Sequence, residues 1–317
     1  MTSAGDDTQY SLRIVGSTPV VRLQRIVDAD CADVYVKLEY FNPTGSYKDR
    51  MALAMIEEAE RRGELRPGMT VVEYTGGSTG SSLAFVCAVK GYRFHVVSSD
   101  AYAPEKLNTM LAFGANLEIV PSTSGRITPD LIPRLVARAS EIAREPNAYF
   151  TDQFNNRDSL VGYAAIGREL LSQVPQRVNA FCGGVGTAGM LMGVAGVLRF
   201  KDATTRIVAL EPASSPAITT GQPGSHHVEG LGVGFVPPLL DRTLYDEARA
   251  IAETEARAMC RRLAKEEGIF AGTSTGLNVV GALQLAKEFG PGHTIVTVAC
   301  DSGLKYLSGD LYSSIAL

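Results

Sequence analysis

The sequence predicts an α/β protein, in which a parallel sheet is covered by helices. Short runs rich in β-branched residues alternate along the chain with longer segments of helical periodicity, the pattern typical of this class. Glycine-rich turns stand where several strands pass into helices. With 317 residues, 45% of them hydrophobic and 20% charged, the chain has the composition of a globular protein with a substantial core.

Each predicted element follows from this alternation. Strands are expected at 33–38, 70–73, 94–98, 117–120, 178–182, 206–210 and 294–299. Helices are expected at 48–62, 79–90, 104–113, 158–172, 187–199, 253–267 and 275–288. Gly63 and Gly91 mark the ends of the first two helices, because glycine readily adopts the left-handed conformation that closes a helix.

Two arrays of strand and helix meet near residues 151–156, which predicts two domains, 1–152 and 153–317, with the first strands expected to cross to the second domain. The longest irregular stretch is expected at 211–238, which is rich in Ser, Pro, Gly and His. Irregular stretches of that length are usually functional or mobile.

Charge and cysteine content exclude several functional classes. The net charge of −4 and the absence of a long basic run argue against sequence-independent binding of nucleic acid. Five scattered cysteines without a C-x-x-C pair predict neither a disulfide framework nor a metal site, and they fit a reducing compartment. The sequence has no run of about 18 apolar residues, the length that a membrane helix needs. The polar N-terminus lacks the features of a secretory signal, so a cytoplasmic location is expected.

Three small-residue loops follow predicted strands and open predicted helices. They span residues 75–80, 183–189 and 272–276. Backbone N–H groups at a helix start can bind phosphate or carboxylate, so the three loops together suggest an anionic ligand.

One interpretation of these loops is dinucleotide binding. Residues 184–189 fit the G-x-G-x-x-G pattern after a strand, and Glu211 follows the next strand as a ribose acceptor would. This interpretation leaves the other two loops unexplained.

A second interpretation is a serine hydrolase. Residues 76–80 and 272–276 both fit G-x-S-x-G, and Asp241 and His293 could complete a triad with Ser78. Two copies of the motif weaken this interpretation, because one active site needs one nucleophile.

A third interpretation begins at Lys48, in the first turn of a predicted helix. The helix dipole there disfavours a cation and so favours the neutral amine, which is the form that adds to a carbonyl group. A solvent-exposed lysine offset by Asp49 is the simpler alternative. Combined with a phosphate-binding loop, however, the lysine predicts pyridoxal 5'-phosphate as cofactor.

The motifs that carry the third interpretation resemble those of the O-acetylserine sulfhydrylase (cysteine synthase) and cystathionine β-synthase family. The resemblance extends from residues 16–23 to residues 301–307, with the motifs in family order. Residues 46–50, Ser-Tyr-Lys-Asp-Arg, are similar to the cofactor-lysine motif, which implies that Lys48 forms the internal aldimine. The fold implied is the tryptophan-synthase-β-like one, with two open twisted sheets flanked by helices and the cofactor between two domains.

The resemblance also implies the site residues. The implied cofactor-binding residues are Lys48, Ser78, Gly184, Val185, Gly186, Thr187, Ala188, Gly189, Met190 and Ser274. The implied substrate-binding residues are Thr75, Gly76, Gly77, Thr79, Gln153 and Gly230. Ser78 and Gly76 stand where the family has asparagine and serine, and both are expected to leave room in the wall of the site. Ala188 and Met190 replace a glycine and a threonine of the phosphate loop, with the loss of one hydroxyl donor.

The implied activity is β-elimination and β-replacement on an activated L-serine such as O-acetyl-L-serine, through an α-aminoacrylate. Sulfide or a related nucleophile would then give L-cysteine or an analogue, within amino-acid biosynthesis. Elimination alone, as in a desulfhydrase or dehydratase, and synthesis of another β-substituted alanine are the open alternatives, with a non-catalytic binding protein the most distant one. The resemblance further implies a homodimer that acts on small molecules.

Overall fold

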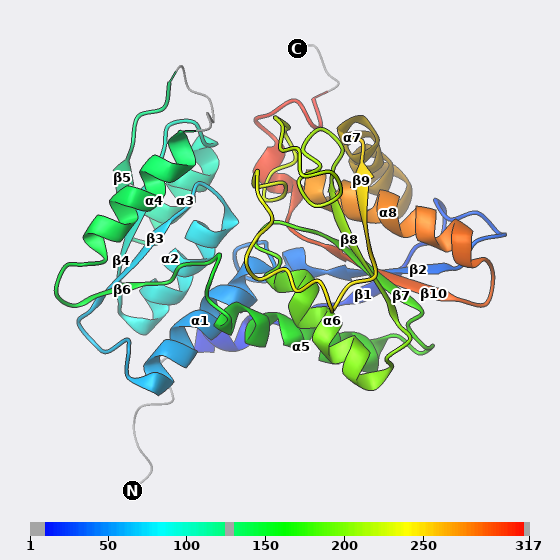
Figure 1. Cartoon of the computed structure of the whole chain (residues 1–317), viewed down its shortest axis with the longest axis horizontal. Coiled ribbons are helices and arrows are strands. Elements are labelled where there is room, and N and C mark those ends of the chain that lie inside the picture. Colours follow the sequence, from blue (N-terminus) through cyan, green and yellow to red (C-terminus); the bar gives the residue numbers. More distant parts are fainter. Residues whose placement is uncertain (1–9, 124–129, 314–317) are drawn as a thin grey trace, which may run out of the picture. The chain divides into compact units, whose positions relative to one another are not determined.

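The computed structural model describes residues 10–123 and 130–313, which form two compact units (Figure 1). Unit 1 holds the described residues up to Gly16 and those from Lys48 to Ser159. Unit 2 holds Ser17–Tyr47 and the described residues from Leu160 onward. Residues 1–9, part of the polar N-terminus in which no secretory signal is expected, lie outside the described residues.

Unit 1 is built on a four-stranded parallel sheet in the order β5-β4-β3-β6. Its strands are β3 (Thr70–Tyr74), β4 (Arg93–Ser98), β5 (Asn116–Ile119) and β6 (Ala148–Phe150). Its helices are α1 (Lys48–Arg62), α2 (Ser78–Lys90), α3 (Pro104–Ala112), α4 (Leu131–Ile142) and the first residues of α5 (Asp158–Gln173), with the short helix η1 (Tyr10–Ile14). Leu131 and Leu135 of α4 pack with Val72 and Val97 in one buried cluster, so the sheet is covered by apolar helix faces.

Unit 2 is built on a six-stranded sheet in the order β1-β2-β10-β7-β8-β9, in which only β1 is antiparallel to its neighbour. Its strands are β1 (Val20–Arg22), β2 (Asp33–Leu38), β7 (Ala180–Gly184), β8 (Arg206–Pro212), β9 (Glu247–Ile251) and β10 (Thr294–Ala299). The helices are most of α5, α6 (Gly189–Lys201), α7 (Glu253–Arg262) and α8 (Thr273–Phe289), with the shorter η2 (Glu39–Phe41), η3 (Leu263–Glu267) and η4 (Gly303–Tyr306).

The prediction of an α/β fold with two sheets flanked by helices is confirmed. Strands β1 and β2, from the start of the chain, complete the sheet of unit 2, where Asp33 of β2 pairs with Thr294 of β10. The predicted functional division into residues 1–152 and 153–317 stays a prediction.

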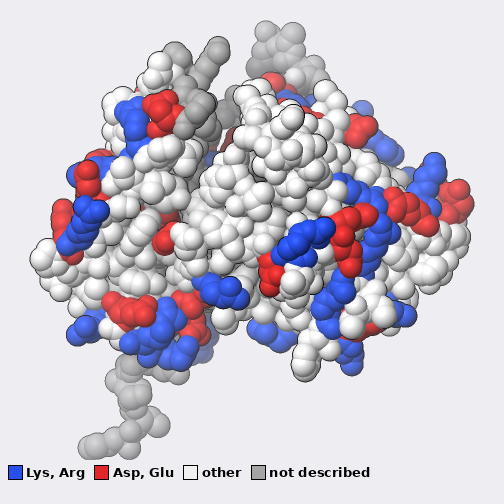
Figure 2. All heavy atoms as spheres, viewed as in Figure 1, with Lys and Arg blue, Asp and Glu red and all other residues white. Residues whose placement is uncertain are grey.

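Charged side chains of both signs are interspersed on the surface of each unit, as Figure 2 shows for one face. In unit 2, for example, Arg249 forms two hydrogen bonds of 2.6 and 2.7 Å to Glu288 and another to Glu247. Among the described residues, none of the helices has the length and apolar character needed to cross a membrane.

Candidate functional site

Lys48 is the first residue of α1, and its exposed fraction is only 8%. The residues just before it are fixed within unit 2. Ser46 forms an antiparallel bridge with Asp301, and the Tyr47 N–H donates to the Cys300 carbonyl at 3.0 Å. The predicted cofactor lysine is therefore a buried side chain that directly follows an anchored segment, not a solvated surface lysine.

In unit 1, the loop after β3 forms a backbone cradle at the start of α2. The Thr75 N–H donates to the Val97 carbonyl at 3.0 Å, and the Thr75 hydroxyl accepts a hydrogen bond from the Gly77 N–H at 3.1 Å. Helix α2 then begins at Ser78, so the loop leads directly into the first N–H groups of a helix. A loop of this kind at a helix N-terminus suits a carboxylate.

Gln153 reaches this loop from the turn that follows β6, the strand paired with β3. The Thr79 hydroxyl donates to Gln153 Oε1 at 2.8 Å, and Gln153 Nε2 donates to the Tyr74 carbonyl at 3.2 Å. Both side chains are buried. The structure thus brings together Thr75, Gly77, Thr79 and Gln153, which the sequence resemblance assigned to the substrate although they lie up to 78 positions apart.

The expectation that Gly76 leaves room in the wall of the site is wrong. A Cβ atom at position 76 would lie 1.9 Å from Cγ and 2.0 Å from Cδ2 of Tyr102. The Tyr102 ring therefore fills the space next to Gly76, and burial raises the pKa of its phenol to about 12. A glycine is needed here because an aromatic side chain from the β4–α3 connection lies directly against the loop.

We therefore expect Gly76→Ser to lower the free energy of unfolding by about 1–3 kcal/mol, the usual effect of overfilling a packed site. Adding Tyr102→Ala should restore part of that loss by making room for the new side chain. Gly77→Ser is the matched control, because a Cβ at position 77 meets nothing within 4 Å. Denaturant unfolding of the four proteins measures the effect, and equal losses at positions 76 and 77 would contradict it.

In unit 2, the loop between β7 and α6 is fixed at its start by three hydrogen bonds. Asn278 Oδ1 accepts from the Gly184 N–H at 2.7 Å, and the Leu210 carbonyl accepts from the Val185 N–H at 2.8 Å. The Val185 carbonyl in turn accepts from the Gly232 N–H at 3.1 Å. This last bond joins the predicted phosphate loop to the glycine-rich strip that contains Gly230.

The centre of the phosphate loop fits an anionic group such as a phosphate. Residues 183–190 are all buried, yet within the described chain the N–H groups of Gly186, Thr187 and Ala188 have no hydrogen-bond acceptor. The first N–H groups of α6 follow immediately, starting at Gly189. Buried N–H groups without acceptors are rare in proteins, so this cluster of donors matches the acceptor oxygens of the cofactor phosphate.

Two residues that depart from the family pattern affect this loop in different ways. Ala188 has φ +68°, in the left-handed region, and this is why α6 begins at Gly189 and not at Thr187 as predicted. The side chain of Met190 turns toward Gly183, where a Cβ would lie 2.6 Å from Met190 Cε. Met190 therefore fills space behind the loop, and only its backbone N–H remains available to a phosphate.

Ser274 lies in the first turn of α8, buried with an exposed fraction of 4%. Two polar atoms close to it in the chain and in the fold are also buried. Thr273 Oγ1 and Asp301 Oδ1 have no hydrogen-bond partner within the described part of the chain, and Asp301 Oδ1 lies 2.4 Å from where a Cβ on Gly272 would be. This end of unit 2 therefore offers unsatisfied polar atoms to a bound polar group.

Asn278 is a residue that the sequence analysis missed. Its side chain joins β7, α8 and β10, because Nδ2 donates to the Val298 carbonyl at 2.8 Å while Oδ1 holds Gly184. A single amide on an otherwise apolar stretch of helix, Gly276–Val280, was the available signal.

The residues invoked by the two alternative interpretations have other roles in the structure. Glu211 is buried at the end of β8 and accepts hydrogen bonds from the Ile218 and Thr219 N–H groups, both at 2.8 Å, so it closes a turn. Asp241 accepts from the Thr243 N–H at 2.8 Å, and His293 Nδ1 contacts the Gly290 carbonyl at 3.3 Å. These contacts favour neither a ribose site nor a catalytic triad.

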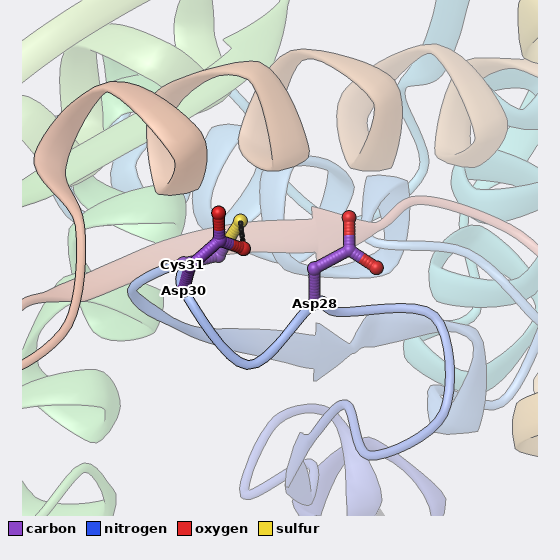
Figure 3. A group of neighbouring side chains, drawn as sticks. All are labelled: Asp28, Asp30 and Cys31. Atoms are coloured by element: carbon purple, nitrogen blue, oxygen red, sulfur yellow. Dashed lines mark hydrogen bonds between the residues drawn. The ribbon is translucent and has the colours of Figure 1, made fainter.

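A separate cluster of potential metal ligands lies in the connection between β1 and β2 (Figure 3). Asp28 and Asp30 are exposed, and their carboxylate oxygens and the Cys31 sulfur lie within 4.8 Å of one another. Partial burial and then the two carboxylates raise the pKa of the Cys31 thiol, which disfavours the thiolate that would bind a metal. The cluster is thus a set of solvated acids beside a protonated thiol.

Comparison with known proteins identifies the family. The profile of the family described as "Pyridoxal-phosphate dependent enzyme" matches residues 12–301. A cysteine synthase of Staphylococcus aureus strain Mu50 is 45% identical over 303 residues, which cover 95% of this chain and 96% of the relative.

Two solved structures are also similar. O-acetyl serine sulfhydrylase isoform 3 from Entamoeba histolytica has a TM-score of 0.91 at 32% identity, covering 99% of this chain and 94% of that one. O-ureido-L-serine synthase has a TM-score of 0.88 at 37% identity, covering 96% of this chain and 95% of that one. With this profile match and these relatives, the chain belongs to the pyridoxal-phosphate dependent enzymes.

Proposed function

We propose that this enzyme catalyses β-replacement on O-acetyl-L-serine, with sulfide as the nucleophile and L-cysteine and acetate as the products. The observation that carries this proposal is that a chain with a buried Lys48 has two helix-opening backbone cradles, residues 75–79 in unit 1 and residues 184–190 in unit 2. One cradle suits an amino-acid carboxylate and the other a phosphate. The cysteine synthase of Staphylococcus aureus and the O-acetyl serine sulfhydrylase of Entamoeba histolytica support it.

Residues of the phosphate loop would hold the cofactor phosphate through the N–H groups of Gly186, Thr187 and Ala188. Ser274 would place its hydroxyl at the ring nitrogen, where a hydroxyl, unlike a carboxylate, leaves that nitrogen largely unprotonated. The cofactor, when bound, supplies a π-system that acidifies the Cα–H bond of the amino acid. A serine at this position makes that π-system a weaker electron sink, which favours prompt loss of a β-substituent.

Lys48 would transfer the proton of the substrate Cα atom. Its Nζ, as a neutral amine, accepts the proton from Cα of the substrate and later returns it to Cα of the product. Lys48 is the first residue of α1, where the helix dipole opposes a positive charge.

The 75–79 loop and Gln153 would orient the substrate by its carboxylate. The Cβ–O bond then breaks and acetate leaves with the bonding electrons, and a Cβ–S bond forms with sulfide. The proton taken from Cα returns there, and the acetoxy group leaves Cβ as acetate, so no oxidant or reductant is needed.

We expect O-acetyl-L-serine to be preferred over O-phospho-L-serine by at least about tenfold in kcat/KM, since a phosphate dianion needs a charged partner. The strip from Ser214 to Phe235 holds neither Lys nor Arg. Its two histidines are engaged, since His226 Nε2 contacts the Gly232 carbonyl at 2.8 Å and His227 Nδ1 lies 3.3 Å from Glu253.

Cysteine formation with sulfide and each donor in turn tests the proposed function. A clear preference for O-phospho-L-serine would overturn the choice of donor. Formation of pyruvate without cysteine at saturating sulfide would favour an elimination-only lyase instead.

A homodimer, taken from the family resemblance, and a cytoplasmic location, taken from the polar N-terminus and the scattered cysteines, complete the proposal. Light scattering of the purified holoenzyme at several concentrations tests the first, and fractionation of the source cells tests the second. Small molecules, not nucleic acids, are the expected ligands, in line with the mixed surface charge in Figure 2.

A further inference from the structure

Glu73 is a buried acid that the proposed mechanism does not use. It lies near the end of β3, in the otherwise apolar run Val71–Tyr74, and its exposed fraction is 0%. No cation pairs with it among the residues described. Burying a carboxyl group is unfavourable unless hydrogen bonds compensate it, so its presence calls for a physical reason.

Three donors converge on the Glu73 carboxyl group. Oε2 accepts from the Thr151 hydroxyl at 2.7 Å and from the Gln153 N–H at 3.0 Å, and Oε1 accepts from the Tyr74 N–H at 2.9 Å. Burial nevertheless raises the pKa of Glu73 to about 7, because these hydrogen bonds offset only part of the desolvation.

Two of these donors flank a strained residue. Asp152, between Thr151 and Gln153, has φ +46°, a conformation that non-glycine residues rarely adopt. Such a conformation persists where the surroundings hold it in place, and it often marks a functional site. Here the Glu73 carboxyl group accepts hydrogen bonds from both neighbours of Asp152, Thr151 and Gln153.

The hydrogen bonds continue from this turn to the substrate loop. Gln153 is fixed at its backbone by Glu73, and its side chain accepts from Thr79 at 2.8 Å and donates to the Tyr74 carbonyl at 3.2 Å. All the residues in this chain of contacts belong to unit 1. The orientation of Gln153 and Thr79 therefore depends on the carboxyl group of Glu73.

We infer that Glu73 is a positioning residue for substrate binding, which sets the strained turn at 151–153 so that Gln153 and Thr79 meet the α-carboxylate of the amino acid. This inference rests on the proposed function only in assigning the 75–79 loop to the carboxylate. It does not depend on which donor or nucleophile the enzyme uses.

The test compares two ligands that lack a β-leaving group, L-alanine and L-alaninamide. Both carry the amino group, but only L-alanine has the carboxylate. Titration of the holoenzyme, followed by the visible absorbance of the cofactor, gives a dissociation constant for each. The dissociation constant of L-alaninamide divided by that of L-alanine measures recognition of the carboxylate alone.

In Glu73→Gln, an NH2 group replaces one of the two carboxyl oxygens. This donor would then face a donor of the protein instead of accepting a hydrogen bond from it, so the turn at 151–153 should shift. We expect the ratio to fall about tenfold, the loss of one hydrogen bond to a charged group, with cofactor affinity changed less than about twofold. KM for O-acetyl-L-serine should rise with a smaller change in kcat. Glu118→Gln is the matched control, a carboxylate on β5 of the same sheet that pairs with Arg138 at the surface, and it should keep the wild-type ratio.

Thr151→Val serves as a second variant of nearly unchanged size that removes a single donor. It should lower the ratio about threefold in the same direction, and it decides the question if Glu73→Gln does not fold. An unchanged ratio in the folded variants would overturn the inference, as would equal weakening of both ligands. A wild-type enzyme that discriminates the two ligands but makes no cysteine would instead overturn the proposed function.

Discussion

Lys48→Ala is expected to lower the rate of cysteine formation by at least about a thousandfold, within the range for loss of a positioned proton-transfer group. The amine is the group proposed to accept the proton from Cα, and no other lysine opens a helix among the described residues. The first turn of α1 should remain folded, because alanine is a strong helix former.

Lys90→Ala is the control for a general effect of losing a lysine. Lys90 ends α2, and its ammonium group pairs with Glu60 at 2.9 Å and with Glu57 at 3.5 Å. That variant should keep nearly all activity. Steady-state assays with matched circular dichroism spectra measure both, and retention of more than about a tenth of the wild-type rate in Lys48→Ala would contradict the role of Lys48.

The second large effect is expected for Gly186→Ala. A Cβ at position 186 would lie 2.1 Å from the Gly230 carbonyl oxygen, a backbone atom that cannot rotate away. Either the phosphate loop or the glycine-rich strip must then move, so the N–H donors lose their arrangement. We expect a loss of about 1–3 kcal/mol in the free energy of unfolding, and at least about a tenfold rise in the dissociation constant of the cofactor.

Gly196→Ala, on α6 itself, is the matched control. A Cβ at position 196 meets nothing within 4 Å, and alanine is favoured over glycine in a helix by up to about 1 kcal/mol. It should therefore stabilise the protein slightly and leave cofactor affinity unchanged. Equal behaviour of the two alanine variants would show that the close approach of residues 186 and 230 has no bearing on cofactor binding.

The long periodic elements could be predicted from the sequence. Helix α1 and strands β2 and β10 have the predicted bounds, because strong periodicity or β-branched runs coincide with clear end signals. Strands β1, β6 and β9 were missed. They have three to five residues and lie at the edges of their sheets, so their formation depends on pairing with a neighbour and little on their own composition.

Two helices show why local pattern was insufficient. Helix α4 contains Pro133, which suggests a break, yet the proline lies in the first turn, where its missing N–H is tolerated. The helix expected over 253–267 ends as α7 at Arg262, and the chain continues as the π-helical turn η3. There Glu267 accepts hydrogen bonds from the N–H groups of Arg25 and Ile26 at 2.6 and 3.0 Å, a contact between distant residues that periodicity cannot reveal.

The candidate site, too, could be predicted from the sequence only in part. Motif chemistry located Lys48 and the loops, because glycines and a lysine at helix starts have a local signature. The packing of Tyr102 on Gly76, the reach of Asn278 to Gly184 and the hold of Glu73 on Gln153 depend on tertiary contacts. None of these could be predicted from the spacing of residues along the chain.

Borohydride reduction of the holoenzyme, followed by peptide mass mapping, tests whether Lys48 holds the cofactor. The reagent makes the bond between a carbonyl cofactor and an amine permanent, so the modified residue can be identified. One modified peptide is expected, which contains Lys48 and carries the mass of reduced pyridoxal phosphate, and no such peptide from Lys48→Ala. Modification of another lysine, or none after saturation with pyridoxal phosphate, would contradict this expectation.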